Sequence, residues 1–230
     1  AKGATVIVMD PYTGEILALA NRPSYDLNDI NASSREERRN RAITDIFEPG
    51  SVFKIFTASA VLEEKALRLT DVLDCENGRY NFGGHVLNDH RPHGRLSFQE
   101  VIEVSSNIGT VKAAMKLGKE KFHKYIRAFG FGVQTGIGLP GEARGLVRPL
   151  SEWSGYSMSS IPMGQEIGVT AIQLAAAVGA IAHDGVLMRP YLVRKIQRAG
   201  GTVIKEYKPT IVRRVISDAT AATVREVMEG

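Results

Sequence analysis

Cysteine is nearly absent from this 230-residue sequence, in which Cys75 is the one thiol. An intrachain disulfide is therefore excluded. The residues around it, LDCENG, match no pattern of a reactive thiol, so we predict a structural role for Cys75. Long apolar runs are also missing. The longest, residues 171–182, is too short to cross a bilayer and is typical of a core helix.

A strong excess of one charge is missing as well. The chain has 29 Lys and Arg against 25 Asp and Glu, a net charge of +4. The densest charged run, REERRNR at residues 35–41, alternates in sign and contains no aromatic side chain. Such a run indicates a solvated surface, and we predict no nucleic-acid partner.

The pattern of apolar residues predicts a mixed fold, α/β or α+β. Two apolar runs, residues 4–9 and 15–20, flank a turn with Pro11 and Gly14 and are typical of a β-hairpin. Because both runs are almost continuously apolar, we expect a sheet covered on both faces. From Ser51 the spacing becomes helical, as far as about Leu67.

The rest of the chain alternates irregular and helical segments. We expect residues 70–95 to be irregular, because they are rich in Gly, Asn, Asp and His. Capping boxes at Ser97–Glu100 and Thr170–Gln173 each predict the start of a helix. Further helices are expected at 107–118, at 119–130 and from Ser217, with short strands between 186 and 216.

Ser51 and Lys54 are three residues apart in FEPGSVFKIFTASAVL (47–62), so one helical face can present both. The apolar neighbours of Lys54 would lower its pKa and leave a neutral amine that can accept a proton. A helix start after Pro49 and Gly50 would also present N–H groups to an oxyanion. The alternative is that Ser51 caps a helix that happens to carry a lysine.

Ser105 and Asn107 form an S-x-N pattern in VSSNIG (104–109), at a break between two predicted helices. Side chains at such a break can point into a cleft, where Ser105 would relay protons beside Lys54 and Asn107 would bind a carbonyl. The alternative is that a serine here only caps the next helix.

S-x-x-K followed about fifty residues later by S-x-N resembles the pattern of penicillin-binding transpeptidases and serine β-lactamases. The resemblance to class B penicillin-binding proteins runs along almost the whole chain. The DH.PHG.L lead-in and SSN are most similar to the septal-division and spore-cortex branch. The segments that resemble class B proteins include ATVIVMDPYTGEILALANRPSYD, RAITDIFEPGSVFKIFTASAVLEE, LNDHRPHGRLSFQEVIEVSSNIGTVKAAMKLG and MGQEIGVTAIQLAAAVGAIAHDGVLMRPYLV.

The resemblance implies a penicillin-binding-protein/serine β-lactamase-like fold, in which a helical lobe packs against an antiparallel sheet. It implies a peptidoglycan D,D-transpeptidase in which Ser51 is the acylated nucleophile and Lys54 the general base. Ser105 would pass protons, and Asn107 would position the stem peptide. The implied ligands are a stem peptide ending in D-Ala-D-Ala and β-lactams. No metal or organic cofactor is expected.

The resemblance also implies a place in the cell. The domain would lie on the extracytoplasmic side of the membrane, in a parent protein anchored in the bacterial cell membrane. A membrane glycosyltransferase and other division proteins would be its partners.

The third motif of the family, K-T-G or K-S-G, is absent from the sequence. In the family it supplies a cationic lysine, a hydroxyl for the substrate carboxylate and a nearby oxyanion N–H. We therefore expect residues 1–230 to be a partial transpeptidase domain, truncated at both ends and with an incomplete sheet. Activity of this chain alone is left open.

Two other functions remain open at this stage. A serine β-lactamase would use the same acyl-enzyme, but class A enzymes usually carry S-D-N, where this chain has Ser106 in the middle. A non-catalytic binding or scaffold module would explain the missing third motif, although the other two motifs are intact. His90 and His93, beside Asp89, make a weak metal pattern, and we expect loop hydrogen bonds there instead.

Overall fold

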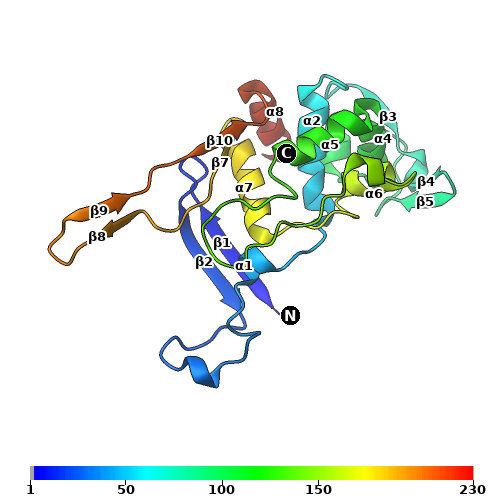
Figure 1. Ribbon diagram of the computed structural model, residues 1–230. Coiled ribbons are helices and arrows are strands. Elements are labelled where there is room, and N and C mark those ends of the chain that lie inside the picture. The colour runs from blue at the N-terminus through cyan, green and yellow to red at the C-terminus, as the bar shows by residue number, and fades with distance from the viewer. Residues whose placement is uncertain (1–2, 230) are drawn as a thin grey trace.

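The computed structural model describes residues 3–229, which form a helical lobe beside a β-hairpin (Figure 1). The helices are α1 (Arg41–Thr44), α2 (Lys54–Glu63), α3 (Phe98–Glu103), α4 (Asn107–Leu117), α5 (Lys119–Ala128), α6 (Ser157–Ser160), α7 (Ala171–Ala182) and α8 (Asp218–Glu229). Two 3-10 turns adjoin the site, η2 (Gly50–Phe53) and η5 (Ile161–Met163).

The strands are β1 (Ala4–Met9), β2 (Ile16–Arg22), β3 (Val72–Asp74), β4 (Arg79–Phe82), β5 (His85–Asn88), β6 (Arg95–Ser97), β7 (Val186–Met188), β8 (Lys195–Gln197), β9 (Val203–Glu206) and β10 (Ile211–Arg214). Within residues 3–229 they form five two-stranded antiparallel sheets, β1–β2, β3–β6, β4–β5, β7–β10 and β8–β9. The mixed class predicted from the sequence is confirmed.

Helix α2 lies at the centre of the lobe because almost all of its side chains are small or apolar. It packs against α4, α5 and α8. At its N-terminal end, four aromatic rings form a cluster of tilted and edge-to-face pairs with centroids 5.0 to 5.6 Å apart, from Phe53, Phe56, Phe129 and Phe131. Because α2 is buried on nearly every side, even the polar side chains of its first turn lie in the core. The charged one among them is Lys54, the first residue of the helix.

Helix α7 packs against the N-terminal hairpin, and Gly179 makes this approach close. A Cβ at Gly179 would lie 2.6 Å from the methyl carbon of Met9. The opposite face of the hairpin is open, with Val6 58% and Leu17 63% exposed. The expectation that both faces are covered is therefore wrong for the described residues. An apolar run shows that a strand could be buried on both faces, but it does not show which faces are covered. In this hairpin, helices cover only one face.

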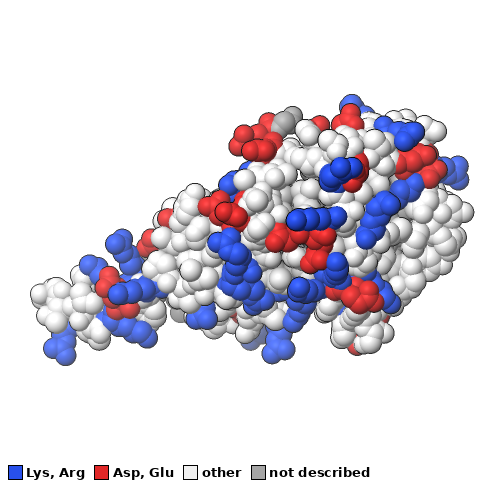
Figure 2. Space-filling view, turned by 90° about the horizontal axis from the view of Figure 1, so that it is seen from above, with Lys and Arg blue, Asp and Glu red and all other residues white. Residues whose placement is uncertain are grey.

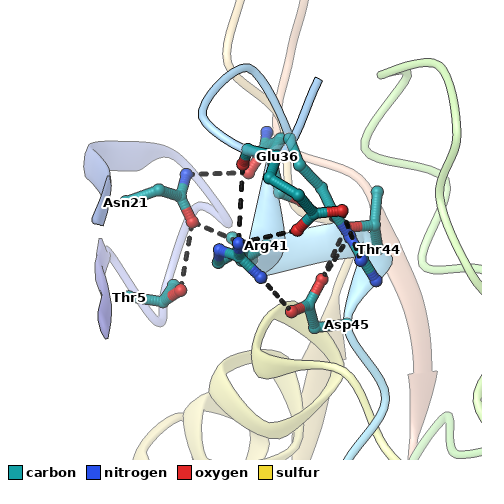
Figure 3. Close-up of polar contacts among 9 residues, drawn as sticks. Thr5, Asn21, Glu36, Arg41, Thr44 and Asp45 are labelled. Atoms are coloured by element: carbon teal, nitrogen blue, oxygen red, sulfur yellow. Dashed lines mark hydrogen bonds and ion pairs between the residues drawn. The ribbon is translucent and has the colours of Figure 1, made fainter. Parts of the chain in front are cut away.

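A polar network ties the hairpin to the segment that leads into the site (Figure 3). The side-chain oxygen of Asn21 accepts hydrogen bonds from the Thr5 hydroxyl, at 3.0 Å, and from the Ala42 N–H of α1, at 3.1 Å. Arg41 pairs with Glu36 and Asp45, each at 3.0 Å. The network therefore fixes α1 on the hairpin five residues before Gly50.

Most of the predicted helix starts are confirmed. Both capping boxes are present, with Ser97 and Thr170 as the cap residues. Helices α4, α5 and α8 lie in the predicted segments. Residues 70–95 are not irregular, however, because they contain β3, β4, β5 and the start of β6. Left-handed residues such as Asn77 and Gly83 divide this segment into strands too short to show a sequence pattern.

Charges of both signs are intermixed over the helical lobe on the face shown in Figure 2, while basic side chains gather around the projecting β8–β9 hairpin. Within residues 3–229, no helix combines the length and the apolar character that a bilayer span requires.

Candidate active site

Ser51 lies in a 3-10 turn, η2, and the α-helix itself begins at Lys54. The predicted helix start at Ser51 is therefore displaced by one turn, and the helix ends at Glu63 instead of near Leu67. The backbone N–H of Lys54 donates to the Ser51 carbonyl, which places the two residues one tight turn apart. The Ser51 residue is exposed, whereas Lys54 is only 4% exposed.

A second segment of the chain holds this turn from behind. The Gly50 N–H donates to the Gly164 carbonyl at 3.0 Å. A Cβ at Gly164 would lie 2.1 Å from the Gly50 carbonyl oxygen, so only glycine fits there. The Glu48 carboxylate also accepts the backbone N–H of Glu166 at 2.9 Å. The turn that presents Ser51 is therefore fixed against residues 164–166.

The Lys54 amine lies against the turn between α3 and α4. It donates to the Ser105 carbonyl at 2.6 Å, to the Ser105 hydroxyl at 3.0 Å and to the Asn107 side-chain oxygen at 2.6 Å. Burial lowers the pKa of Lys54 to about 8, against the opposing charge of Asp89. At neutral pH a minor fraction of the amine is therefore uncharged and able to accept a proton.

Ser105 faces Lys54 through an unusual backbone conformation. Its φ of 56° is left-handed, which is costly for a residue other than glycine. In this conformation its carbonyl and its hydroxyl both reach the same amine. Such strain persists where the surrounding structure enforces it, and it is concentrated at functional sites.

Three of the four predicted site residues thus meet directly: Lys54, Ser105 and Asn107. Ser51 adjoins them through the backbone, and no hydrogen bond joins its hydroxyl to the Lys54 amine in residues 3–229. The exposed Ser51 and Ser105 leave the site open to solvent above a buried amine.

The sequence analysis missed Asp89 as part of this arrangement. Its carboxylate accepts the Ser106 hydroxyl at 2.7 Å and the N–H groups of Asn107 and Ile108 at 2.5 and 3.0 Å. The sequence places this residue only within a weak metal pattern with His90 and His93. In residues 3–229, no three His, Cys, Asp or Glu side chains are placed to share a metal ion. No local sequence signal connects Asp89 with a helix start eighteen residues later.

Cys75 lies behind the same turn. It is fully buried, and the Ser106 hydroxyl lies 3.4 Å from its sulfur. Burial raises the pKa of the Cys75 thiol, so the thiol stays protonated and unreactive at neutral pH. The predicted structural role agrees with this environment.

A groove of about 500 Å³ adjoins the turn that carries Ser51. Apolar and charged side chains both line it, and Arg148 lies 3.5 Å from the Glu166 carboxylate. Its lining includes Phe47, Glu48, Leu146, Arg148, Ser160 and Glu166. An extended ligand next to Ser51 would find both apolar and polar partners in this groove.

Comparison with known proteins identifies the family. Residues 4–230 match the model of the family described as "Penicillin binding protein transpeptidase domain". Among curated proteins, the chain is 38% identical to penicillin-binding protein PbpB of Mycolicibacterium smegmatis, over 99% of the chain and 35% of the relative. It is 35% identical to stage V sporulation protein D of Bacillus subtilis, over 99% of the chain and 36% of the relative.

The peptidoglycan D,D-transpeptidase FtsI of Escherichia coli is 32% identical over the whole chain and 37% of the relative. A crystal structure of penicillin-binding protein 3 from Mycobacterium tuberculosis, complexed with aztreonam, superposes with a TM-score of 0.88 at 36% identity. That match covers 99% of this chain and 51% of the crystallised one. The chain thus spans about a third of its curated relatives, and it belongs to the penicillin-binding protein transpeptidase family.

Proposed function

We propose that the protein containing this chain is a peptidoglycan D,D-transpeptidase that works through an acyl-enzyme on Ser51. One observation supports this above all. A buried lysine with a pKa near 8 lies one turn from an exposed serine and hydrogen-bonds to Ser105 and Asn107. Such a lysine is costly to bury and suited to accept a proton.

In the first half of the reaction, the Ser51 oxygen attacks the carbonyl carbon between the two terminal D-Ala residues of a stem peptide. The uncharged amine of Lys54 takes the hydroxyl proton as the bond forms. N–H groups at the start of a helical turn have no acceptor within the helix, so they stabilise the developing oxyanion.

Collapse of this intermediate breaks the peptide bond and needs a proton on the departing amine. The Ser105 hydroxyl, 3.0 Å from the Lys54 amine, passes that proton from Lys54 to the leaving D-Ala. Asn107 holds the substrate amide beside the same amine. An ester on Ser51 remains, and an amine from a neighbouring strand attacks it through the same steps in reverse order. β-Lactams acylate Ser51 because they imitate the terminal dipeptide.

Lys54 has a different hydrogen-bond pattern in its reactive form. An ammonium group can donate to all three acceptors around it, whereas a neutral amine has two N–H groups and one lone pair. In the neutral form the Ser105 hydroxyl donates to that lone pair. The site therefore contains a hydroxyl that can move a proton on or off Lys54.

Residues 1–230 form part of the transpeptidase domain in this proposal, and the K-T-G motif lies elsewhere in the protein. The greater length of the relatives supports this. The domain works outside the cytoplasm in a protein anchored in the membrane, together with a membrane glycosyltransferase and other division proteins. The named activity of the relatives supports the substrate, a stem peptide ending in D-Ala-D-Ala.

The positions of Glu142 and Glu166 favour the transpeptidase over a class A serine β-lactamase. Such an enzyme needs a carboxylate that activates water beside the ester. Glu142 instead binds the Thr135 N–H and hydroxyl, both at 2.6 Å. Glu166 binds the Ser157 hydroxyl at 2.8 Å and pairs with Arg148. Both side chains therefore serve the surrounding loops.

The experiment that tests the function measures release of D-Ala from a synthetic pentapeptide ending in D-Ala-D-Ala by the full-length protein. Ser51→Ala should abolish release, and Ser34→Ala, at an exposed loop position, should leave it unchanged. A folded wild-type protein that is acylated neither by the peptide nor by a β-lactam would favour the binding-module alternative.

A further inference from the structure

The turn that presents Ser105 and Asn107 to Lys54 is held from outside both motifs. The carboxylate of Asp89, directly after β5, spans the N-terminal end of α4. One oxygen accepts the Asn107 and Ile108 N–H groups, and the other accepts the Ser106 hydroxyl. These contacts occupy donors that a helix start leaves without intrahelical partners, and a negative charge is favourable there.

The middle residue of the S-x-N pattern has a defined task in this arrangement. The Ser106 hydroxyl donates to Asp89 and accepts the Gly109 N–H at 3.0 Å as the N-cap of α4. Ser106 is only 2% exposed, so both bonds form inside the core. The Ser106 hydroxyl is therefore fixed both as a donor and as an acceptor.

Asn107 is oriented by the same part of the chain. Its side-chain NH₂ donates to the Asn88 carbonyl at 2.8 Å, which leaves its oxygen directed at the Lys54 amine, 2.6 Å away. Asp89 is itself anchored, because its backbone N–H donates to the Gly78 carbonyl at 3.1 Å. Consecutive residues at the end of β5 thus control the backbone and the side chain of Asn107.

We propose that Asp89 is a positioning residue of the active site, which holds Ser105 and Asn107 against Lys54 by fixing the first turn of α4. The inference rests on the proposed acyl-transfer function. It also explains the left-handed conformation of Ser105, since a turn anchored one and two residues later leaves that residue little freedom.

Asp89 has an electrostatic effect in addition to its geometric one. The groups directly on the Lys54 amine, Ser105 and Asn107, are neutral. Among the described residues, Asp89 is the charged group that acts on Lys54, and its charge raises the pKa that burial lowers. Removing this charge should lower the pKa of Lys54 further, so the uncharged base would be available at lower pH.

The test measures the rate at which benzylpenicillin acylates the full-length protein, by intact mass, from about pH 6 to about pH 10 around the pKa of Lys54. Asp89→Ala removes all three acceptor contacts and should slow acylation about tenfold to a hundredfold, as loss of catalytic geometry does. Asp89→Asn keeps an oxygen for the two N–H groups and removes the charge. It should move the acid limb of the profile to lower pH.

Asp74→Asn is the matched control, since the carboxylate that it removes from β3 accepts the Glu76 N–H at 2.8 Å and not a donor of α4. Its rate and pH profile should equal those of the wild type. Thermal unfolding shows whether a slow variant has lost its fold or only the placement of Ser105 and Asn107. If D89A does not fold, D89N, which keeps the oxygen for the two N–H groups, is the variant to be tested. If Asp89 had a purely structural role, D89N would be acylated more slowly at every pH, and the acid limb of its pH profile would coincide with that of the wild type.

Two results would overturn this inference and leave the proposed function intact. One is that benzylpenicillin acylates folded D89A at the wild-type rate, and the other is that the acid limb of the pH profile of D89N does not move. Failure of the wild-type protein to be acylated would instead overturn the proposed function, and this inference with it.

Discussion

The Lys54 amine lies 2.6 Å from the side-chain oxygen of Asn107, a residue 53 positions further along the chain. This contact joins the two sequence motifs into one site and brings the buried amine to the group proposed to hold the substrate.

Acylation should depend on the charge state of Lys54. Burial lowers the pKa of this lysine to about 8, so the uncharged fraction grows as pH rises through that value. The acylation rate should therefore rise between neutral and mildly alkaline pH and then level off. Lys54→Met should reduce the rate by about 10²- to 10⁴-fold, the usual contribution of a general base. A rate that falls across this pH range would contradict the assignment.

Ser105 offers a way to separate its hydroxyl from its backbone. Ser105→Ala and Ser105→Gly both remove the hydroxyl and should both slow acylation. Only glycine adopts the left-handed φ of 56° without strain, so S105G should be more stable than S105A by about 1 kcal/mol. Urea unfolding measures the difference. If either folded variant is acylated at the wild-type rate, the Ser105 hydroxyl is dispensable.

Gly164 should be indispensable for the turn that carries Ser51. A Cβ there would lie 2.1 Å from the Gly50 carbonyl oxygen, and the φ of 80° is already left-handed. Gly164→Ala should therefore lose acylation and cost about 2 kcal/mol or more, through backbone strain and overpacking. The control is Gly138→Ala, where φ is 82° but no atom lies within 4 Å of the added carbon. Equal effects of the two substitutions on acylation would argue against a fixed nucleophile turn.

Glu63 should make the stability of the fold depend on acid pH. Its carboxylate accepts the Ser217 N–H and hydroxyl at 3.0 and 2.8 Å, which attaches the start of α8 to the end of α2. Burial raises the pKa of Glu63, but hydrogen bonds from Thr220 and Ser217 outweigh this and lower it overall. The stabilisation is therefore present above the unfolded-state pKa of about 4.3 and is lost as pH falls through the folded value.

Glu63→Gln should lower the free energy of unfolding by about 1 kcal/mol at neutral pH, as loss of a helix cap does. The difference from the wild type should shrink in acid, where the wild-type carboxyl is protonated. Urea titrations at the two pH values measure it, with the exposed Glu120→Gln as the control. A difference that is the same at both pH values would contradict the role of the charge.

Local sequence patterns predicted the elements whose causes are local. The capping boxes at Ser97 and Thr170 form because cap and partner are three residues apart. The burial of Lys54, which makes it a candidate base, was predictable because its apolar neighbours are also adjacent in the sequence. The exposed face of β1 was not predictable, since an apolar strand does not reveal which of its faces a distant helix covers.

Asp89 was beyond such patterns for the same reason. It acts on a helix that begins eighteen residues later, after two turns and a further helix, and only the fold brings them together. The short strands between 70 and 95 place it there, and strands of three or four residues leave almost no periodicity to detect. The family resemblance identified the residues proposed to react, but not the residue that holds them in place.

The role of Ser51 can be tested by the intact mass of the full-length protein after incubation with benzylpenicillin, followed by peptide mapping. One stable adduct is expected, located on Ser51 and absent from the S51A variant. A folded wild-type protein that gains no adduct, or one whose adduct lies on another residue, would contradict the central claim that Ser51 is the nucleophile activated by Lys54.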